Sequence, residues 1–272
     1  MAFLCAKNAI NLEEFAFIDQ VGKIMLFYAP SCGSTQDLVP LCARQAGGKH
    51  PTALLTFEQT SGRGQFPRIW ESEPGKNLAL SVWFPLKNPR PETFPLLNMV
   101  LTVASIKALR QHGIEAEIKW PNDLRYQGAK LAGLLMDIQS EVAIGKALCL
   151  GIGVNVNQTD FNSLPQPATS LKNIAGKEHN LMDLARSLLV RLQTAFSDWA
   201  KQPDNNFFLD EFNSLIEGLN GLWEAENAAG EKVTGYLTGE DTQGRLLFNT
   251  GGETTAFHHG TLRLKSQITN NG

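Results

Sequence analysis

The sequence predicts an α+β fold, in which a mixed sheet with flanking helices is followed by a small all-β unit. Short apolar runs alternate with stretches of helical spacing until about residue 218, and only short β-like runs follow, separated by turns that contain glycine. A chain of 272 residues is long enough for one large domain and a small appendage. We therefore predict a first domain over residues 1–218 and a second over residues 219–272.

The strands of the first domain are predicted from short apolar runs that lead into turns. Residues 23–29 are apolar and aromatic, and the run ends at Pro30. The last run carries Gly151 and Gly153, which predict a buried strand narrowed for close packing. The predicted strands cover residues 23–29, 53–57, 78–84, 115–120, 131–138 and 147–156.

Helices are predicted where apolar residues recur at helical spacing. Over residues 94–112 this spacing is followed by Gly113, which is a plausible stop. Asn180 can cap the strongest helix, because its side-chain oxygen can accept from the first free backbone N–H groups. The predicted helices run from Ser34 or Thr35 toward Gln45 and over residues 94–112, 181–200 and 207–216.

The C-terminal part of the sequence, after about residue 218, has the pattern of an all-β unit. Its β-like runs cover residues 232–237, 245–249, 254–258 and 261–265, at the spacing expected of a small barrel. His258 and His259 lie in this tail, and we expect them on the surface and not as metal ligands.

Composition excludes several classes of protein. A formal net charge of −3 gives no global attraction to nucleic acid or to an anionic membrane. The four cysteines form no C-x-x-C pair and have no histidine at metal-ligand spacing, so we predict neither a zinc site nor a disulfide framework, in a reducing, cytoplasmic compartment. No apolar run reaches the roughly 18 residues that span a bilayer, and no signal peptide or helix-turn-helix is predicted ahead of the first strand.

The segment from Lys119 to Asp123, followed by Lys130 to Gly133, places two lysines, a carboxylate and a carboxamide among apolar residues. An ammonium group beside buried apolar surface costs several kcal/mol unless an anion meets it. An anionic ligand is therefore expected. Each lysine taken alone could instead reach water, Lys119 from an amphipathic strand and Lys130 from a hairpin.

A second segment, from Gln59 to Trp70, carries Gly62-Arg63-Gly64. Glycines let backbone N–H groups approach an anion, and arginine adds charge and a planar set of donors. Taken alone, the loop is equally consistent with a surface turn. The sequence has no P-loop, no dinucleotide fingerprint, no H-x-x-x-H pair and no G-x-S-x-G, so a nucleotide would bind outside the common motifs.

Taken together, these segments resemble biotin protein ligase, the enzyme that couples biotin to a lysine of carboxylase biotin-carrier domains. The matching pieces occur in the family's order. They are Ser34-Thr35, Gln59 with Gly62-Arg63-Gly64 through Arg68 and Trp70, Lys119-Trp120-Pro121-Asn122-Asp123, Lys130-Leu131-Ala132-Gly133 and Gly151-Ile152-Gly153-Val154-Asn155.

The resemblance implies a fold and a reaction. Residues 1–218 are expected to form the class II synthetase-like catalytic fold of biotin and lipoate ligases, and residues 219–272 an SH3-like β-barrel. Biotin's carboxylate attacks the α-phosphorus of ATP to give biotinyl-5′-adenylate, with Mg²⁺ as cofactor, and a carrier lysine then attacks this mixed anhydride. The implied partner is the biotin carboxyl carrier domain of acetyl-CoA carboxylase, and a homodimer is also implied.

The resemblance also implies the site. Lys130 and Arg63 are the predicted catalytic residues: Lys130 bridges the biotin carboxylate and the α-phosphate, and Arg63 helps to close the glycine loop. Asp123 is a candidate base for the transfer step, and the Mg²⁺ ligands are left unassigned. The predicted biotin-binding residues are Ser34, Thr35, Gln36, Gln59, Gly62, Arg63, Gly64, Gln65, Lys130 and Gly133. The predicted ATP-binding residues are Arg68, Trp70, Lys119, Asn122, Asp123, Lys130 and Asn155.

Two positions depart from the family's usual loop, Gly-Arg-Gly-Arg-x-Gly-Arg-x-Trp. Gln65 replaces the second arginine and Pro67 replaces the later glycine. A neutral amide cannot replace a guanidinium at an anion, and proline restricts φ. We predict weaker retention of the adenylate and a stiffer loop.

Two other functions fit parts of the pattern. A lipoate ligase or octanoyl transferase resembles the same catalytic fold, although the glycine loop, the 119–123 segment and the β tail are of the biotin type. A catalytically silent biotin-binding protein is the second, because of Gln65 and Pro67. We expect a ligase without repressor activity, since the catalytic domain begins almost at once.

Overall fold

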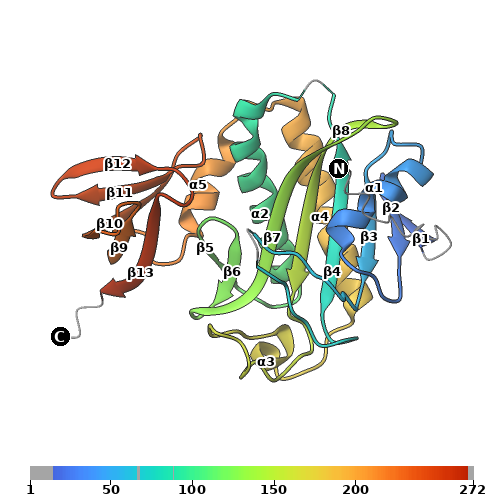
Figure 1. Ribbon diagram of the computed structural model, residues 1–272, viewed down its shortest axis with the longest axis horizontal. Coiled ribbons are helices and arrows are strands. Elements are labelled where there is room, and N and C mark those ends of the chain that lie inside the picture. Colours follow the sequence, from blue (N-terminus) through green and yellow to red (C-terminus); the bar gives the residue numbers. More distant parts are fainter. Residues whose placement is uncertain (1–14, 66–67, 88, 269–272) are drawn as a thin grey trace, which may run out of the picture.

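A computed structural model describes residues 15–65, 68–87 and 89–268. Its larger sheet has the order β1-β2-β3-β4-β8-β7-β6-β5 (Figure 1). β2 and β3 run parallel and the other neighbours run antiparallel, so the sheet is mixed, as predicted. The strands are β1 (Ala16–Val21), β2 (Ile24–Tyr28), β3 (Thr52–Thr56), β4 (Leu78–Pro85), β5 (Glu117–Lys119), β6 (Asp123–Tyr126), β7 (Ala129–Glu141) and β8 (Gly145–Val154).

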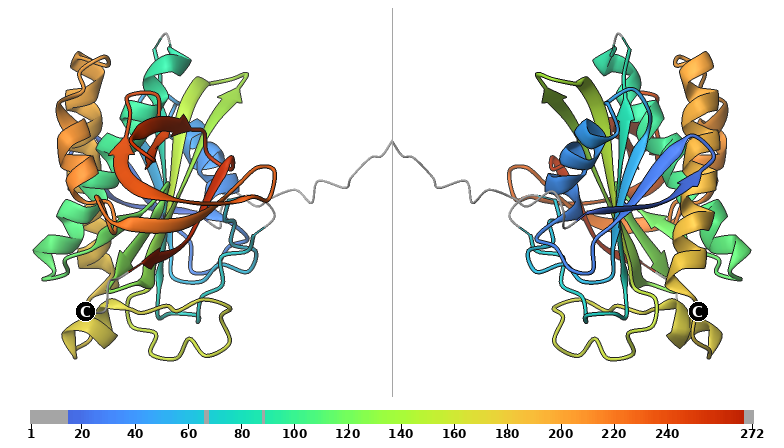
Figure 2. Two further views of the ribbon diagram at one scale, coloured as in Figure 1. Left: turned by 90° about the vertical axis from the view of Figure 1, so that its left-hand side faces the viewer. Right: turned by 90° about the vertical axis from the view of Figure 1, so that its right-hand side faces the viewer.

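Helices cover both faces of this sheet. Figure 2 shows α2 and α4 on one side and α1 on the other. Asn180 caps α4 as predicted, because its side-chain oxygen accepts from the backbone N–H groups of Met182 and Asp183. The helices are α1 (Thr35–Gln45), α2 (Phe94–Gln111) with the 3₁₀ turn η2 (Pro91–Thr93) before it, α3 (Leu171–Ala175), α4 (Leu181–Lys201) and α5 (Phe207–Ser214).

Among the residues described, one helical segment, Pro91–Gln111, is long and apolar enough to cross a membrane. Its apolar window is 72% buried inside the protein, as in the core helix of a soluble protein. The burial follows from composition, since apolar residues occur all round α2 and therefore require partners on every side.

Strand alternation creates a hollow on the α1 face of the sheet. Successive side chains of a strand point to opposite faces, so Ser81 of β4 shares a face with its partner Gly151 of β8. One step along, Ala79 pairs with Gly153, and Gly153 pairs with Gly133 of β7. Ser81 and Gly151 lie against the first turn of α1, which carries Thr35 and Gln36, and Gly153 and Gly133 lie against Trp70. The small residues at these positions of β4, β7 and β8 thereby leave room for a cavity above the sheet.

The second sheet has the order β12-β11-β10-β9-β13. β12 and β13 are its edge strands, and closure into the predicted barrel is not seen in the strand pairing of the described residues. The chain passes from the first sheet to the second between α5 and β9, where the predicted boundary at 218/219 lies. The strands are β9 (Leu222–Asn227), β10 (Lys232–Glu240), β11 (Leu246–Thr250), β12 (Glu253–Phe257) and β13 (Leu262–Ile268).

Candidate active site

A cavity of about 870 Å³ opens on the α1 face of the large sheet. Its walls come from the start of α1, the glycine loop, the turn between β5 and β6, and residues 259–264 of the second unit, with β4, β7 and β8 as floor. All predicted site residues except Gly62 line it. They are Ser34, Thr35, Gln36, Gln59, Arg63, Gly64, Gln65, Arg68, Trp70, Lys119, Asn122, Asp123, Lys130, Gly133 and Asn155.

One half of the cavity is a neutral polar slot at the start of α1. The Thr35 backbone N–H donates to Gln59 Oε1 at 2.8 Å, and the Thr35 and Ser81 hydroxyl oxygens are 2.9 Å apart. Ser81 donates to Gln36 Oε1 at 3.0 Å, and Gln36 Nε2 donates to the Cys149 carbonyl at 3.2 Å. Buried groups that are bonded to one another hold fixed orientations. The slot is therefore built to recognise a neutral polar group.

Ser34 adds a polar atom with no partner of its own. It occupies the N-cap position of α1 but makes no capping bond, and its hydroxyl is buried without a hydrogen bond. An unsatisfied buried hydroxyl costs about 1–3 kcal/mol. Because Ser34 lines the cavity, a ligand is the partner that would satisfy it.

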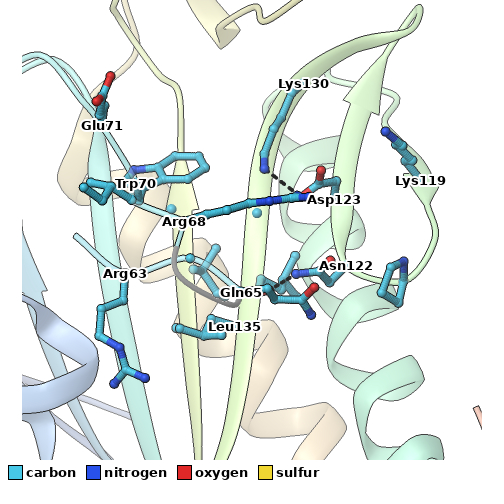
Figure 3. A pocket seen from close by; sticks show the side chains of 18 of the residues that line it. Arg63, Gln65, Arg68, Trp70, Glu71, Lys119, Asn122, Asp123, Lys130 and Leu135 are labelled. Atoms are coloured by element: carbon cyan, nitrogen blue, oxygen red, sulfur yellow. Dashed lines mark hydrogen bonds and ion pairs between the residues drawn. The ribbon is translucent and has the colours of Figure 1, made fainter. Parts of the chain in front are cut away.

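The other half of the cavity is charged. Lys130 Nζ lies 2.7 Å from Asp123 Oδ1 and 5.5 Å from the centre of a Trp70 ring (Figure 3). The backbone of Lys130 is fixed, since its N–H donates to the Pro167 carbonyl and its carbonyl accepts from Thr169. The ammonium group is thus aimed into the cavity with one carboxylate as its partner.

Lys119 is a cation whose charged form is disfavoured by its surroundings. Burial lowers the pKa of Lys119, and the nearby positive charges of Arg125 and Lys130 lower that pKa further. Asp123 and Glu217 oppose the shift without cancelling it. A bound polyanion would offset this cost of burial, because an opposite charge at close range favours the charged form of an amine.

Glycines let side chains lie directly on the floor of the cavity. A Cβ atom at Gly153 would lie 2.4 Å from Trp70 Cε2, and one at Gly133 would lie 3.3 Å from Trp70 Cζ3. At Gly151 a Cβ would lie 2.7 Å from Gln36 Oε1. The predicted narrowing of β8 is confirmed, with Gln36 and Trp70 as the groups that use the space.

The glycine loop is folded back on itself. Its arginine, Arg63, pairs with Asp37 of α1 and lies 3.8 Å from Asp137 Oδ2 of β7. Figure 3 shows Arg63 pointing away from Lys130, so the two predicted catalytic residues share the cavity without meeting. Gly62 does not line the cavity, and its carbonyl accepts from the Trp70 N–H at 2.9 Å.

The two departures from the family's loop fall in different places. Gln65 lines the cavity, whereas Pro67 lies outside the described residues, so the expectation of a stiffer loop stays a prediction. Arg68, on the far side of the loop, extends toward Asp123 (Figure 3).

Several lining residues were not predicted from the sequence. Ser81 is the one polar residue of a buried strand, which is a signal that alternation offers. Glu71 gave no such signal. His259 is exposed as expected, yet it lines the cavity and packs edge-on against Trp120, with 5.4 Å between ring centroids. Contacts of this kind depend on how the second unit packs against the first.

Comparisons with known proteins agree with this site. The model of the biotin/lipoate A/B protein ligase family matches residues 28–157, which include most of the cavity. Two proteins named bifunctional ligase/repressor BirA, from Bacillus subtilis and Bacillus spizizenii, are 32% and 30% identical over 73% and 83% of this chain. The chain spans 62% and 69% of their lengths.

Two further matches cover nearly the whole of the protein compared. A Mycobacterium tuberculosis protein named biotin–acetyl-CoA-carboxylase ligase is 27% identical over 92% of this chain and 94% of its own. The solved structure of biotin protein ligase from Aquifex aeolicus in complex with biotin and ATP has a TM-score of 0.72 at 26% identity, over 88% of this chain and 98% of that one. The resemblance found in the sequence is confirmed, and the chain belongs to the biotin/lipoate A/B protein ligase family as a ligase of the biotin protein ligase type.

Proposed function

We propose that the protein is an ATP-dependent biotin protein ligase, which activates biotin as biotinyl-5′-AMP and transfers it to a lysine of the biotin carboxyl carrier domain of acetyl-CoA carboxylase. One observation carries the proposal: a rigid neutral slot and a cationic corner adjoin in a single cavity. Biotin has a neutral polar ring at one end and a carboxylate at the other, so it needs both kinds of surface. The names of the relatives support the carboxylase carrier.

The slot would hold the ring of biotin. Thr35, Gln36 and Gln59 supply hydrogen-bonding groups whose orientation is already fixed, and the unpartnered Ser34 hydroxyl supplies one more. Preorganised groups lose little entropy when a ligand binds. The valeryl chain would then lead out of the slot within the same cavity and bring the carboxylate to Lys130.

The charged half would serve the activation step. A biotin carboxylate oxygen forms a bond to the α-phosphorus of ATP, the bond from that phosphorus to the β-bridging oxygen breaks, and pyrophosphate leaves. Two anions must meet for this to happen. Lys130 can leave Asp123 for the carboxylate and α-phosphate, and Lys119 and Arg68 flank the same corner. Cations that meet charge as it develops lower the barrier.

Mg²⁺ would enter with ATP. Among the residues described, no three acidic, histidine or cysteine side chains are grouped so as to hold a metal ion. Asp123 and Glu71 are the carboxylates that line the cavity. One or two carboxylates together with substrate phosphates is the usual way in which proteins hold Mg²⁺, and when bound the ion would neutralise phosphate charge.

In the transfer step, the ε-amine of the carrier lysine attacks the carbonyl carbon of the adenylate, the bond to the phosphate oxygen breaks, and AMP leaves. The amine must lose a proton, and Asp123 is the carboxylate we propose as its acceptor, since release from Lys130 would free it. Free Cys32, Cys42 and Cys149 suit the reducing cytoplasm in which we place the reaction.

The direct test is transfer of biotin to an isolated carrier domain. The purified protein, biotin and Mg·ATP are incubated with the domain, and modification of its lysine is measured by mass spectrometry. We expect modification that requires both biotin and ATP. Modification by lipoate in place of biotin would identify a lipoate ligase. Biotin binding without pyrophosphate release would identify a silent biotin-binding protein, and either result would contradict the proposal.

A further inference from the structure

The second unit places one carboxyl group next to the turn from Lys119 to Asp123, which connects β5 and β6. Glu240 is the last residue of β10 and only 3% of its surface is exposed. Its backbone is held at both ends by Asn213 of α5: the Glu240 N–H donates to Asn213 Oδ1 at 2.8 Å, and Asn213 Nδ2 donates to the Glu240 carbonyl at 3.1 Å. The origin of the side chain is therefore fixed relative to the first unit.

This carboxyl group lies near the indole of Trp120. The indole N–H of Trp120 and Oε2 of Glu240 are both buried, and neither makes a hydrogen bond among the described residues. The two groups interact, since the Trp120 N–H lowers the pKa of the Glu240 carboxyl. His259, also from the second unit, packs edge-on against the same indole at 5.4 Å. Two side chains of the second unit thus hold one tryptophan of the first.

Trp120 is the buried centre of the turn that carries the charged half of the cavity. Lys119 precedes it, and Asn122 and Asp123 follow within three residues; all of them line the cavity. Figure 1 shows the second sheet beside α5 and next to β5 and β6, the strands that this turn connects. A displacement of Trp120 would therefore move Asp123 relative to Lys130.

The environment of Glu240 favours its neutral form. Burial raises the pKa of Glu240 to about 8, and the negative charge of Asp241 adds to the rise, although Asp241 is itself paired with Arg245 at 2.6 Å. His259 is a second titratable neighbour of Trp120, and its pKa is lowered by partial burial and by Arg68. The carboxyl group is accordingly neutral below pH 8 and becomes a buried charge above it.

We propose that Glu240 is a positioning residue for adenylate formation, which acts through Trp120 to hold the Lys119 to Asp123 turn in register with Lys130. This role rests on the proposed function, because it assigns the turn to the ATP side of the reaction. It assigns nothing to the biotin slot, whose residues come from α1, β4 and the loop that follows β3. A substitution at Glu240 should therefore change the KM for ATP and leave the affinity for biotin unchanged.

Two substitutions distinguish positioning from bulk stability. Glu240→Gln keeps the size and an oxygen acceptor but cannot ionise, whereas Glu240→Leu removes the acceptor. Glu226→Gln is the matched control, because Glu226 is a carboxylate of the same sheet that pairs with Lys265 at 2.9 Å, away from Trp120. Biotin affinity, the KM for ATP and biotin-dependent ATP–pyrophosphate exchange are measured for each on both sides of pH 8.

We expect exchange by the wild-type protein and by Glu226→Gln to fall as the pH rises through about 8. Glu240→Gln should lose that fall, and Glu240→Leu should raise the KM for ATP about tenfold without weakening biotin binding. A folded Glu240→Leu with an unchanged KM for ATP, or a Glu240→Gln with the wild-type pH profile, would overturn the proposal. If Glu240→Leu does not fold, the profile of Glu240→Gln decides.

A spectroscopic reading needs no substrate. The indole N–H resonance of Trp120, identified by its loss in Trp120→Phe, should shift with a midpoint near pH 8 in the wild-type protein and stay constant in Glu240→Gln. A Trp120 resonance that does not change with pH in either the wild-type protein or Glu240→Gln would contradict the interaction between Glu240 and Trp120. Absence of biotin-dependent exchange in the wild-type protein would instead count against the proposed function alone.

Discussion

The two halves of the cavity are built in opposite ways. In the slot, Thr35, Gln36 and Ser81 are each at most 3% exposed and are hydrogen-bonded to one another or to Gln59. In the charged half, the side chain of Lys130 is 19% exposed and is paired with the carboxylate of Asp123. The polar groups of the slot are already hydrogen-bonded to one another before a ligand binds. In the charged half, the cation must leave a protein carboxylate in order to contact the ligand.

This difference follows from the chemistry of the ligands we propose. A neutral ring is recognised by fixed dipoles, which are costly to leave unpaired and are therefore bonded in advance. A buried cation needs an anion at all times, so protein carboxylates take the place of the ligand until it binds. Substitutions in the slot should change affinity for biotin, and substitutions in the charged half should change the rate of adenylate formation.

The largest effect is expected for Lys130→Ala. Removal of the cation at the meeting point of two anions should lower the rate of adenylate formation by about 10²- to 10³-fold, while biotin affinity falls much less. Lys172→Ala is a matched control, because Lys172 pairs with Glu178 away from the cavity. If the biotin affinity of Lys130→Ala fell by the same factor as its rate of adenylate formation, the two halves of the cavity would not have the separate roles proposed for them.

A pair of glycine substitutions on one strand tests the comparison within β8. Gly151→Ala should displace Gln36, and Gly153→Ala should displace Trp70, because each new Cβ would lie within 3 Å of that side chain. Overpacking of this kind typically costs about 1–3 kcal/mol, or roughly tenfold to hundredfold. We expect Gly151→Ala to raise the KM for biotin and Gly153→Ala to raise the KM for ATP. Effects on the same substrate would contradict the division.

Thr35→Val tests the slot alone. It keeps the side-chain shape but leaves Ser81 and Gln59 without the Thr35 hydroxyl. The unpaired groups should cost about 1–2 kcal/mol, which weakens biotin binding by roughly tenfold, with ATP affinity unchanged. Isothermal titration with each ligand measures both. An unchanged biotin affinity would show that the network is structural and takes no part in binding.

The smallest effect is expected for Gln65→Arg, which restores the charge that the family's loop carries. Gln65 lies at the partly open wall of the cavity, where an ion pair contributes about 0.2–1 kcal/mol. Release of biotinyl-adenylate should slow by up to about fivefold. The dissociation rate of the isolated adenylate gives this number directly, and no change would sink the argument from charge.

Contiguous parts of the site were predictable from sequence, and parts assembled by long-range packing were not. Two segments can be recognised from the sequence because charged and amide side chains interrupt apolar runs there: Lys119 to Asp123 and Lys130 to Gly133. Ser81 belongs to the site only through the register of β4 with β8, and the role proposed for Glu240 depends on the packing of the second unit against the first. Neither arrangement is encoded in local spacing.

The elements missed by pattern have physical reasons as well. β1 is an edge strand whose residues are mostly exposed, so the apolar alternation that marks a strand is absent there. β6 begins at Asp123, in a stretch of Pro, Asn and Asp that predicts a turn. The pairing of Arg63 with Asp37 is invisible to any spacing rule, because it depends on how the loop folds back over α1.

The central claim is that one cavity brings the carboxylate of biotin to the α-phosphate of ATP. Exchange of labelled pyrophosphate into ATP, measured with the unmodified protein and without any carrier domain, tests it most directly, because exchange requires that both substrates react in the same site. We predict exchange that depends on biotin and is not supported by lipoate. Exchange that proceeds equally without biotin, or no exchange when both substrates are bound, would contradict the account.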